Sequence, residues 1–208
     1  MKTIYKIART ELQTLFYSPV AWLILVIFTF QASMAFTDML GGYVRSQSLG
    51  YRLWSVTEGA FGGMRGLFTQ MQQYLYLYIP LLTMGLMSRE LSSGSIKLLY
   101  SSPVTNTQII LGKYLSMMIY GLVLTGILMV YMIFALFAVK SADFPAMLSG
   151  LLGLYLLLCA YAAIGLFMSS VTSYQVVAAM GTLAILAVLN YVKGMWQDIE
   201  FVRDITYW

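Results

Sequence analysis

The chain has 208 residues, of which 60% are hydrophobic and 10% charged, against about 25% charged in an ordinary soluble domain. A chain of this length could build one soluble core, but so little charge excludes a soluble protein and predicts an integral membrane protein. The absence of histidine excludes histidine-based catalytic triads, histidine general bases and the common zinc sites. The net charge of +4 comes from scattered basic residues, which fits a membrane surface better than a nucleic-acid surface.

The first segment, residues 3–17, is predicted to be an amphipathic helix. Its apolar side chains recur at helical spacing, and its basic side chains lie off that stripe. A basic amphipathic helix ahead of an apolar run is typical of an interfacial helix that lies in the headgroup layer. A cleaved signal peptide is the alternative, because residues 33–35 offer a small-x-small site. The long amphipathic approach and its acidic Glu11 do not fit the basic region of a signal peptide, so we favour an uncleaved anchor.

Five later segments are predicted to span the membrane, since about 20 apolar residues cross a hydrocarbon core of about 30 Å. These spans cover approximately residues 20–40, 68–87, 114–139, 147–168 and 175–192. Residues 41–67 are polar and rich in glycine, which indicates an exposed loop, and residues 140–145 form a short turn. Residues 193–208 are polar and aromatic and are typical of a surface segment. We therefore predict an all-α membrane protein, a polytopic helical bundle that forms one transmembrane domain over residues 1–208.

The stretch 87–113, between the second and third spans, holds most of the polar character of the middle of the chain. A short apolar cluster within it ends at Pro103, which lacks an N–H and disfavours helix at the residue before it. Thr105 and Gln108 have the spacing of a capping box, so a new helix should begin there and continue through Lys113. An exposed apolar turn held between two spans suggests a docking site for a soluble partner.

The predicted spans carry almost no ionisable residues. Residues 114–139 and 144–192 contain no Asp, Glu, Lys, Arg or His, whereas ion-coupled transporters and intramembrane hydrolases place such residues at midplane depth. Gly112 and Lys113 are followed by a tyrosine, so the chain has no P-loop. We expect a non-catalytic protein with no catalytic residues, no cofactor and no metal site.

Two further patterns have both a functional and a packing interpretation. Tyr74 and Tyr78 share one helix face and could line a pathway, although tyrosine near a membrane boundary is usually part of an aromatic belt or of the packing. Ser149 and Gly153 match a small-xxx-small pattern, which allows two helices to approach closely.

Charge alone does not orient the bundle. With the N-terminus inside, six basic residues would lie inside and six outside, so the positive-inside rule gives a tie.

Within the stretch 87–113, the order of residues resembles the coupling region of ABC-2 type permeases. That order is an acidic residue, Gly-Ser, a leucine pair, Pro-Val and Gly-Lys, represented here by Glu90, Gly94, Leu98, Leu99, Pro103, Val104, Gly112 and Lys113. Residues 79–84 are similar to the same family, especially to the gliding-motility-associated permease subunits of Bacteroidetes.

The resemblance implies a permease subunit in the bacterial inner membrane, with a cytoplasmic N-terminus. It implies two permease halves, a homodimer or a heterodimer, above two ATPase subunits that hydrolyse ATP to drive substrate movement, with export as the expected direction. A cytoplasmic coupling hairpin at residues 88–113 would dock on the ATPase, and its docking residues would be Glu90, Gly94, Ile96, Leu98, Leu99 and Pro103. The leucines could instead be buried against the membrane face, and Gly94 could be only a turn. No nucleic-acid partner is expected.

The resembling family has six spans, so the chain is expected to be truncated at its C-terminus and to lack one span. A different class of function also fits, namely a non-transporting membrane anchor or mechanical scaffold for an ATPase complex. A continuous polar cavity through the assembled bundle would distinguish the two.

Overall fold

The computed structural model describes residues 2–48, 66–96, 104–138 and 143–197, and every regular element in these ranges is an α-helix. Seven helices follow one another along the described chain. They are α1 (Lys2–Tyr17), α2 (Pro19–Ser48), α4 (Leu67–Thr83), α5 (Ser88–Ser93), α7 (Asn106–Ala138), α8 (Phe144–Val171) and α9 (Gln175–Gln197).

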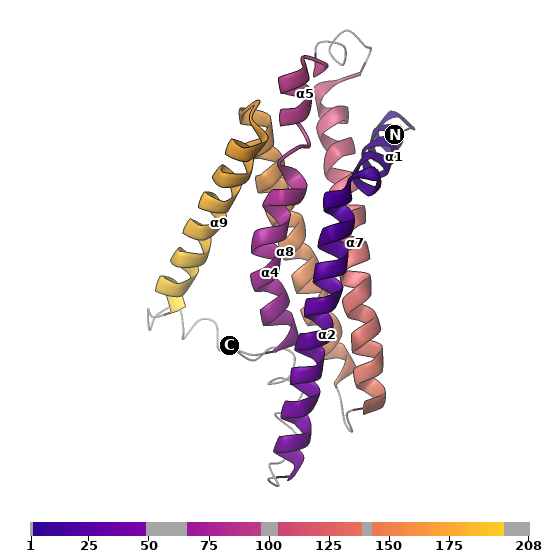
Figure 1. Cartoon of the computed structure of the whole chain (residues 1–208), viewed down its shortest axis with the longest axis vertical. Coiled ribbons are helices and arrows are strands. Elements are labelled where there is room, and N and C mark those ends of the chain that lie inside the picture. The colour runs from indigo at the N-terminus through magenta and orange to yellow at the C-terminus, as the bar shows by residue number, and fades with distance from the viewer. Residues whose placement is uncertain (1, 49–65, 97–103, 139–142, 198–208) are drawn as a thin grey trace.

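Four long helices, α2, α4, α7 and α8, run side by side, and α9 leans away from them at its far end (Figure 1). The short helices α1 and α5 lie at the same end of this bundle, beside the first turns of α7 and α9 (Figure 1). We call this the α1 end. It brings together α1, which precedes α2, and the segment that connects α4 to α7.

Four of the helices are long and apolar enough to cross a membrane, counting only the described part of the chain. Their apolar stretches are Pro19–Arg45, Asn106–Phe137, Phe144–Val171 and Gln175–Val192. The predicted second span, residues 68–87, corresponds to α4, which has 17 residues and ends at Thr83. The prediction placed the end of this helix four residues too late, because hydrogen bonds to α8 replace the helical pattern after Thr83, as described below. The count of five spans therefore stays a prediction.

Three predicted boundaries differ from the structure. The loop expected from residue 41 is helical as far as Ser48, because α2 continues through the two glycines to bury Tyr43 against its neighbours. The turn expected at residues 140–145 gives way to α8 at Phe144, since Pro145 is at the first helical turn, where its missing N–H has no cost. The surface segment was expected from residue 193, but α9 continues as a helix as far as Gln197.

The expected helix start after Pro103 is confirmed. Helix α7 begins at Asn106, directly after Thr105, and the backbone N–H of Thr105 donates to Oε1 of Gln108 at 3.4 Å. This is the reciprocal bond of a capping box. The helix that starts there is continuous with the predicted span at residues 114–139, so Lys113 lies two turns inside α7.

Helix α1 has the predicted bounds to within one residue, and its apolar side is packed against protein. Ala8 and Leu15 are buried, and the side chain of Ile7 lies directly against Gly112 of α7. A Cβ atom at Gly112 would come within 2.6 Å of Ile7 Cγ2, so the glycine lets the two helices approach. The basic residues Lys6 and Arg9 are exposed on the opposite side of α1.

Tyrosine hydroxyls join the long helices through backbone carbonyls. Tyr120 of α7 donates to Ala21 of α2 at 2.8 Å, and Tyr76 of α4 donates to Leu183 of α9 at 3.1 Å. A hydroxyl in an apolar environment requires a partner, because water is absent there. These bonds satisfy the hydroxyls and fix which helices are neighbours.

Candidate functional site

The most unusual feature of the α1 end is a buried lysine. The side chain of Lys113, on α7, is 2% exposed, and its Nζ lies 2.5 Å from Oε1 of Glu11 on α1 and 2.7 Å from Oε1 of Glu90 on α5. An ammonium taken out of water is stable only when carboxylates or other acceptors surround it. The three side chains, which we call the Lys113 triad, therefore tie three separate helices to one point.

Local sequence explains how each member reaches this point. Glu11 is on the same side of α1 as Ala8 and Leu15, three residues before it and four after it, so it faces α7. Glu90 is in the first turn of α5, where the positive end of the helix dipole favours a carboxylate. Lys113 follows Gly112, a residue at which α1 and α7 approach closely.

The charges of the triad are not balanced within it. Two carboxylates share one ammonium, which leaves a formal charge of −1. Oε2 of Glu90 is buried and accepts no hydrogen bond from any described residue. An unpaired carboxylate oxygen in a buried place costs free energy. The ion pair between Glu90 and Lys113 therefore holds α5, while the second oxygen of Glu90 lacks a partner among the described residues.

A buried serine on α8 fixes the bend between α4 and α5. Oγ of Ser169 accepts hydrogen bonds from the backbone N–H groups of Met87 at 3.0 Å and Ser88 at 3.1 Å, and it donates to the carbonyl of Met84 at 3.0 Å. Ser169 is fully buried. The two bonds that Ser169 accepts satisfy N–H groups that the end of α4 and the start of α5 would otherwise leave unpaired, whereas the carbonyl of Met84 also accepts from the hydroxyl of Ser88. The position of α5 therefore depends on α8 as well as on α7.

The predicted docking residues separate into two groups. Glu90 points toward the bundle and binds Lys113, Gly94 ends α5 with a left-handed φ of 70°, and Ile96 is half-buried against the core. A φ of this sign strains any residue with a Cβ atom, which explains the glycine. The other three lie outside the described residues, namely Leu98, Leu99 and Pro103.

The predicted pathway residues are on α4. Tyr78 is 4% exposed, its hydroxyl donates to Oε1 of Gln31 on α2, and its ring meets the edge of Phe28 at 6.2 Å. Tyr74 is half-buried. Tyr78 thus contributes to the packing of α4 against α2, and a role in lining a pathway stays a prediction for both tyrosines.

Sequence reasoning missed two members of this site. Glu11 was considered only as evidence against a signal peptide, and Ser169 was given no role. The signal for Glu11 is its place on the apolar stripe of an amphipathic helix, where an acidic residue needs a partner. A serine gives no comparable signal, because serine is common at helix ends.

The long apolar helices define a multi-pass helical membrane protein, and the buried Lys113 triad ties α1 and α5 to one of these helices, α7. Residues 5–199 match the family described as ABC-2 family transporter protein, and the chain belongs to that family. A search of curated proteins and a search of solved structures produced no match. Members of the ABC-2 family are the membrane permease components of ABC transporters, which implies association with an ABC ATPase.

Proposed function

We propose that this chain is the permease subunit through which ATP hydrolysis by a partner ATPase moves a substrate across the membrane. The observation that supports the proposal best is the Lys113 triad. It links α5, the first helix of the expected docking hairpin, to α1 and to the long helix α7. A force applied to α5 is thereby passed to a membrane-spanning helix by a direct ionic contact.

The triad explains why these helices would move together. Separation of α5 from α7 would leave a buried ammonium with one carboxylate, and separation of α1 would do the same. Breaking a buried ion pair costs several kcal/mol, roughly 3–5 in well-studied cases. Rigid-body movement of α1, α5 and the first turns of α7 is therefore favoured over their separation. ATP then acts as a ligand that stabilises one of two arrangements of the bundle.

The finer assignments belong to the same proposal. Leu98 and Leu99 form the apolar contact with the ATPase, while Gly94 and Pro103 set the shape of the hairpin. A second permease subunit completes the pathway, and the α1 end faces the cytoplasm of a bacterial cell, below the inner membrane. The direction is export, and the similarity of residues 79–84 favours the gliding-motility-associated subgroup.

A non-transporting membrane scaffold for an ATPase complex is the second candidate. The Lys113 triad serves it equally well, because an anchor also needs a rigid contact between the docking hairpin and the membrane helices. Transport by the reconstituted complex separates the two candidates.

Docking is tested by Leu98→Asp and Leu99→Asp, with Ser93→Asp as the matched control. A charge placed in an apolar contact stays unpaired, which costs several kcal/mol, so both leucine variants should lose co-purification with the ATPase. Ser93 is exposed at the end of α5, and the same charge there should leave co-purification unchanged. Co-purification of both leucine variants at the wild-type level would contradict the docking role.

Coupling is tested separately by Glu90→Gln. This variant keeps the apolar contact and removes one carboxylate from Lys113. It should retain the ATPase but lower the transport per ATP hydrolysed. Wild-type coupling in this variant would remove the triad from the mechanism.

A further inference from the structure

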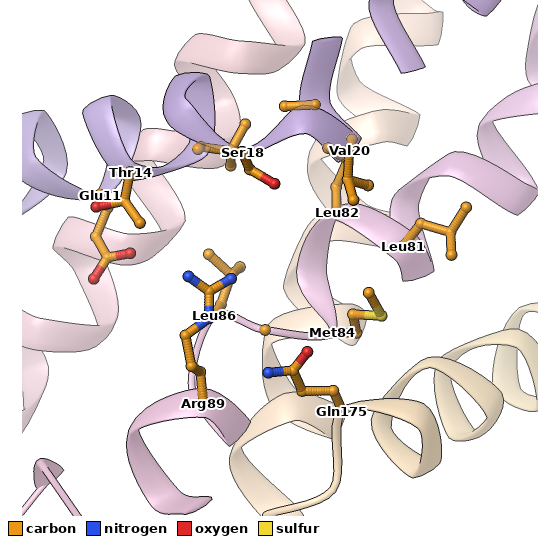
Figure 2. A pocket seen from close by; sticks show the side chains of 13 residues that line it. Glu11, Thr14, Ser18, Val20, Leu81, Leu82, Met84, Leu86, Arg89 and Gln175 are labelled. Carbon is orange, nitrogen blue, oxygen red and sulfur yellow. The ribbon is translucent and has the colours of Figure 1, made fainter. Parts of the chain in front are cut away.

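A second polar feature of the α1 end is a pocket between the α1–α2 elbow, the bend from α4 to α5 and the start of α9 (Figure 2). Its volume is about 150 Å³, well above the roughly 15 Å³ that one ordered water requires. Arg89 and Gln175 direct their polar ends into this space, and Val20, Leu81 and Leu82 lie across it (Figure 2). One side of the pocket is therefore polar and the other aliphatic.

The pocket lies at the level where three apolar helices begin or end. Val20 is the second residue of the apolar stretch of α2, Leu81 is in the last turn of α4, and Gln175 is the first residue of α9. The side chains of Val20 and Leu81 are both more than one-third exposed. This level corresponds to the boundary between hydrocarbon and headgroups, and the aliphatic side of the pocket opens toward the hydrocarbon.

The electrostatics of the pocket favour an anion. Arg89 is exposed and forms no ion pair with any other described residue. Gln175 begins α9, so the positive end of that helix dipole is at the pocket wall. Glu11 is also in the wall, and it shares Lys113 with Glu90 in a triad whose formal charge is −1, so the attraction for an anion comes from Arg89 and the start of α9.

The backbone also makes room for the arginine. A Cβ atom at Gly85 would lie 2.9 Å from Nη2 of Arg89, so the guanidinium rests directly over this glycine. A side chain at this position would push the guanidinium away from the place where Figure 2 shows it. The planar guanidinium of Arg89 presents a fork of N–H donors, which suits a phosphate better than the point charge of a lysine does.

We propose that this pocket binds one phospholipid from the leaflet at the α1 end. The phosphodiester group contacts Arg89 and the start of α9, and the acyl chains follow Val20 and Leu81 into the membrane. The proposal does not depend on an ATPase partner, and it adds a lipid contact to the segment that connects α4 to α5. A lipid bound there would hold the α1–α2 elbow against that segment.

The test measures lipid binding to the delipidated, purified chain by native mass spectrometry in detergent. The probes are phosphatidylglycerol, a diacylglycerol with the same acyl chains, and inorganic phosphate. Loss of charge-assisted hydrogen bonds should weaken phosphatidylglycerol binding by about tenfold or more in Arg89→Gln. Binding of diacylglycerol should be weak in both proteins, and millimolar inorganic phosphate should not displace the phospholipid.

Two further variants make the result decisive. Arg9→Gln removes an exposed arginine from α1 that does not border this pocket, and it should bind like the wild type. Val20→Trp fills the aliphatic side with Arg89 unchanged, and it should also lose phosphatidylglycerol. Equal binding by wild type, Arg89→Gln and Val20→Trp would overturn the proposal. Displacement by inorganic phosphate would overturn it in favour of a free-anion site.

Discussion

Replacement of Lys113 by methionine tests the role of the triad in stability. Methionine has nearly the length of lysine but no charge, so the change leaves Glu11 and Glu90 facing each other in a place where both side chains are only 21% exposed. Removal of one partner from a buried ionic group costs about 3–5 kcal/mol. We expect a loss of this size in the free energy of unfolding of Lys113→Met.

The triple variant Glu11→Gln/Lys113→Met/Glu90→Gln separates the effect of unpaired charge from that of lost packing. It keeps similar volumes but removes all three charges, and apolar or neutral replacement of a buried ionic group is often neutral. It should therefore recover most of the stability lost in Lys113→Met. Lys6→Met is the matched control, because Lys6 is exposed on α1.

Unfolding of these variants in mixed detergent and SDS micelles, followed by tryptophan fluorescence, gives the comparison. The chain has 4 tryptophans, which provide the signal. The reasoning is refuted if Lys113→Met unfolds like Lys6→Met, or if the triple variant is less stable than the single one.

Two more predictions concern the contacts of α8. Gly165→Val should destabilise the bundle by about 1–3 kcal/mol through overpacking, because a Cβ atom at Gly165 would overlap the side chain of Thr83. Gly153→Val is the control and should cost much less, since the neighbouring helices place no atom within 4 Å of a Cβ there. Equal melting temperatures of the two variants would contradict this prediction. Ser169→Ala should lower the free energy of unfolding by about 1–3 kcal/mol, because two backbone N–H groups lose their acceptor. Ser170→Ala is its control, since that exposed hydroxyl bonds only within its own helix. Protease sensitivity at the bend from α4 to α5 should rise in Ser169→Ala alone.

Local patterns predicted much of the helical architecture. The apolar runs predicted α2, α7, α8 and α9, because their lengths match the membrane and few charges interrupt them. The capping box at Thr105 and Gln108 predicted the start of α7, since this signal depends only on residues three apart. The amphipathic spacing likewise predicted α1.

Close helix contacts were harder to predict from local patterns. Ser149 and Gly153 matched a small-xxx-small pattern, yet both are exposed, and the close contacts of α8 with α4 occur at Gly150 and Gly165. Small residues permit close approach wherever they occur along a helix. The position of the partner helix decides which of them is used, and no local pattern contains that information.

The sequence by itself determined that this is a helical membrane protein, because hydrocarbon tolerates only backbones that satisfy their own hydrogen bonds, and long uncharged runs satisfy them as helices. It also determined where the polar stretch between α4 and α7 lies. Only the tertiary structure decided that Glu11 and Glu90 meet Lys113, at separations of 102 and 23 residues, and that Ser169 fixes the bend 81 residues before it. The physical reason is that the pairing of buried charges and backbone groups depends on which helices are neighbours in space, and packing sets that arrangement.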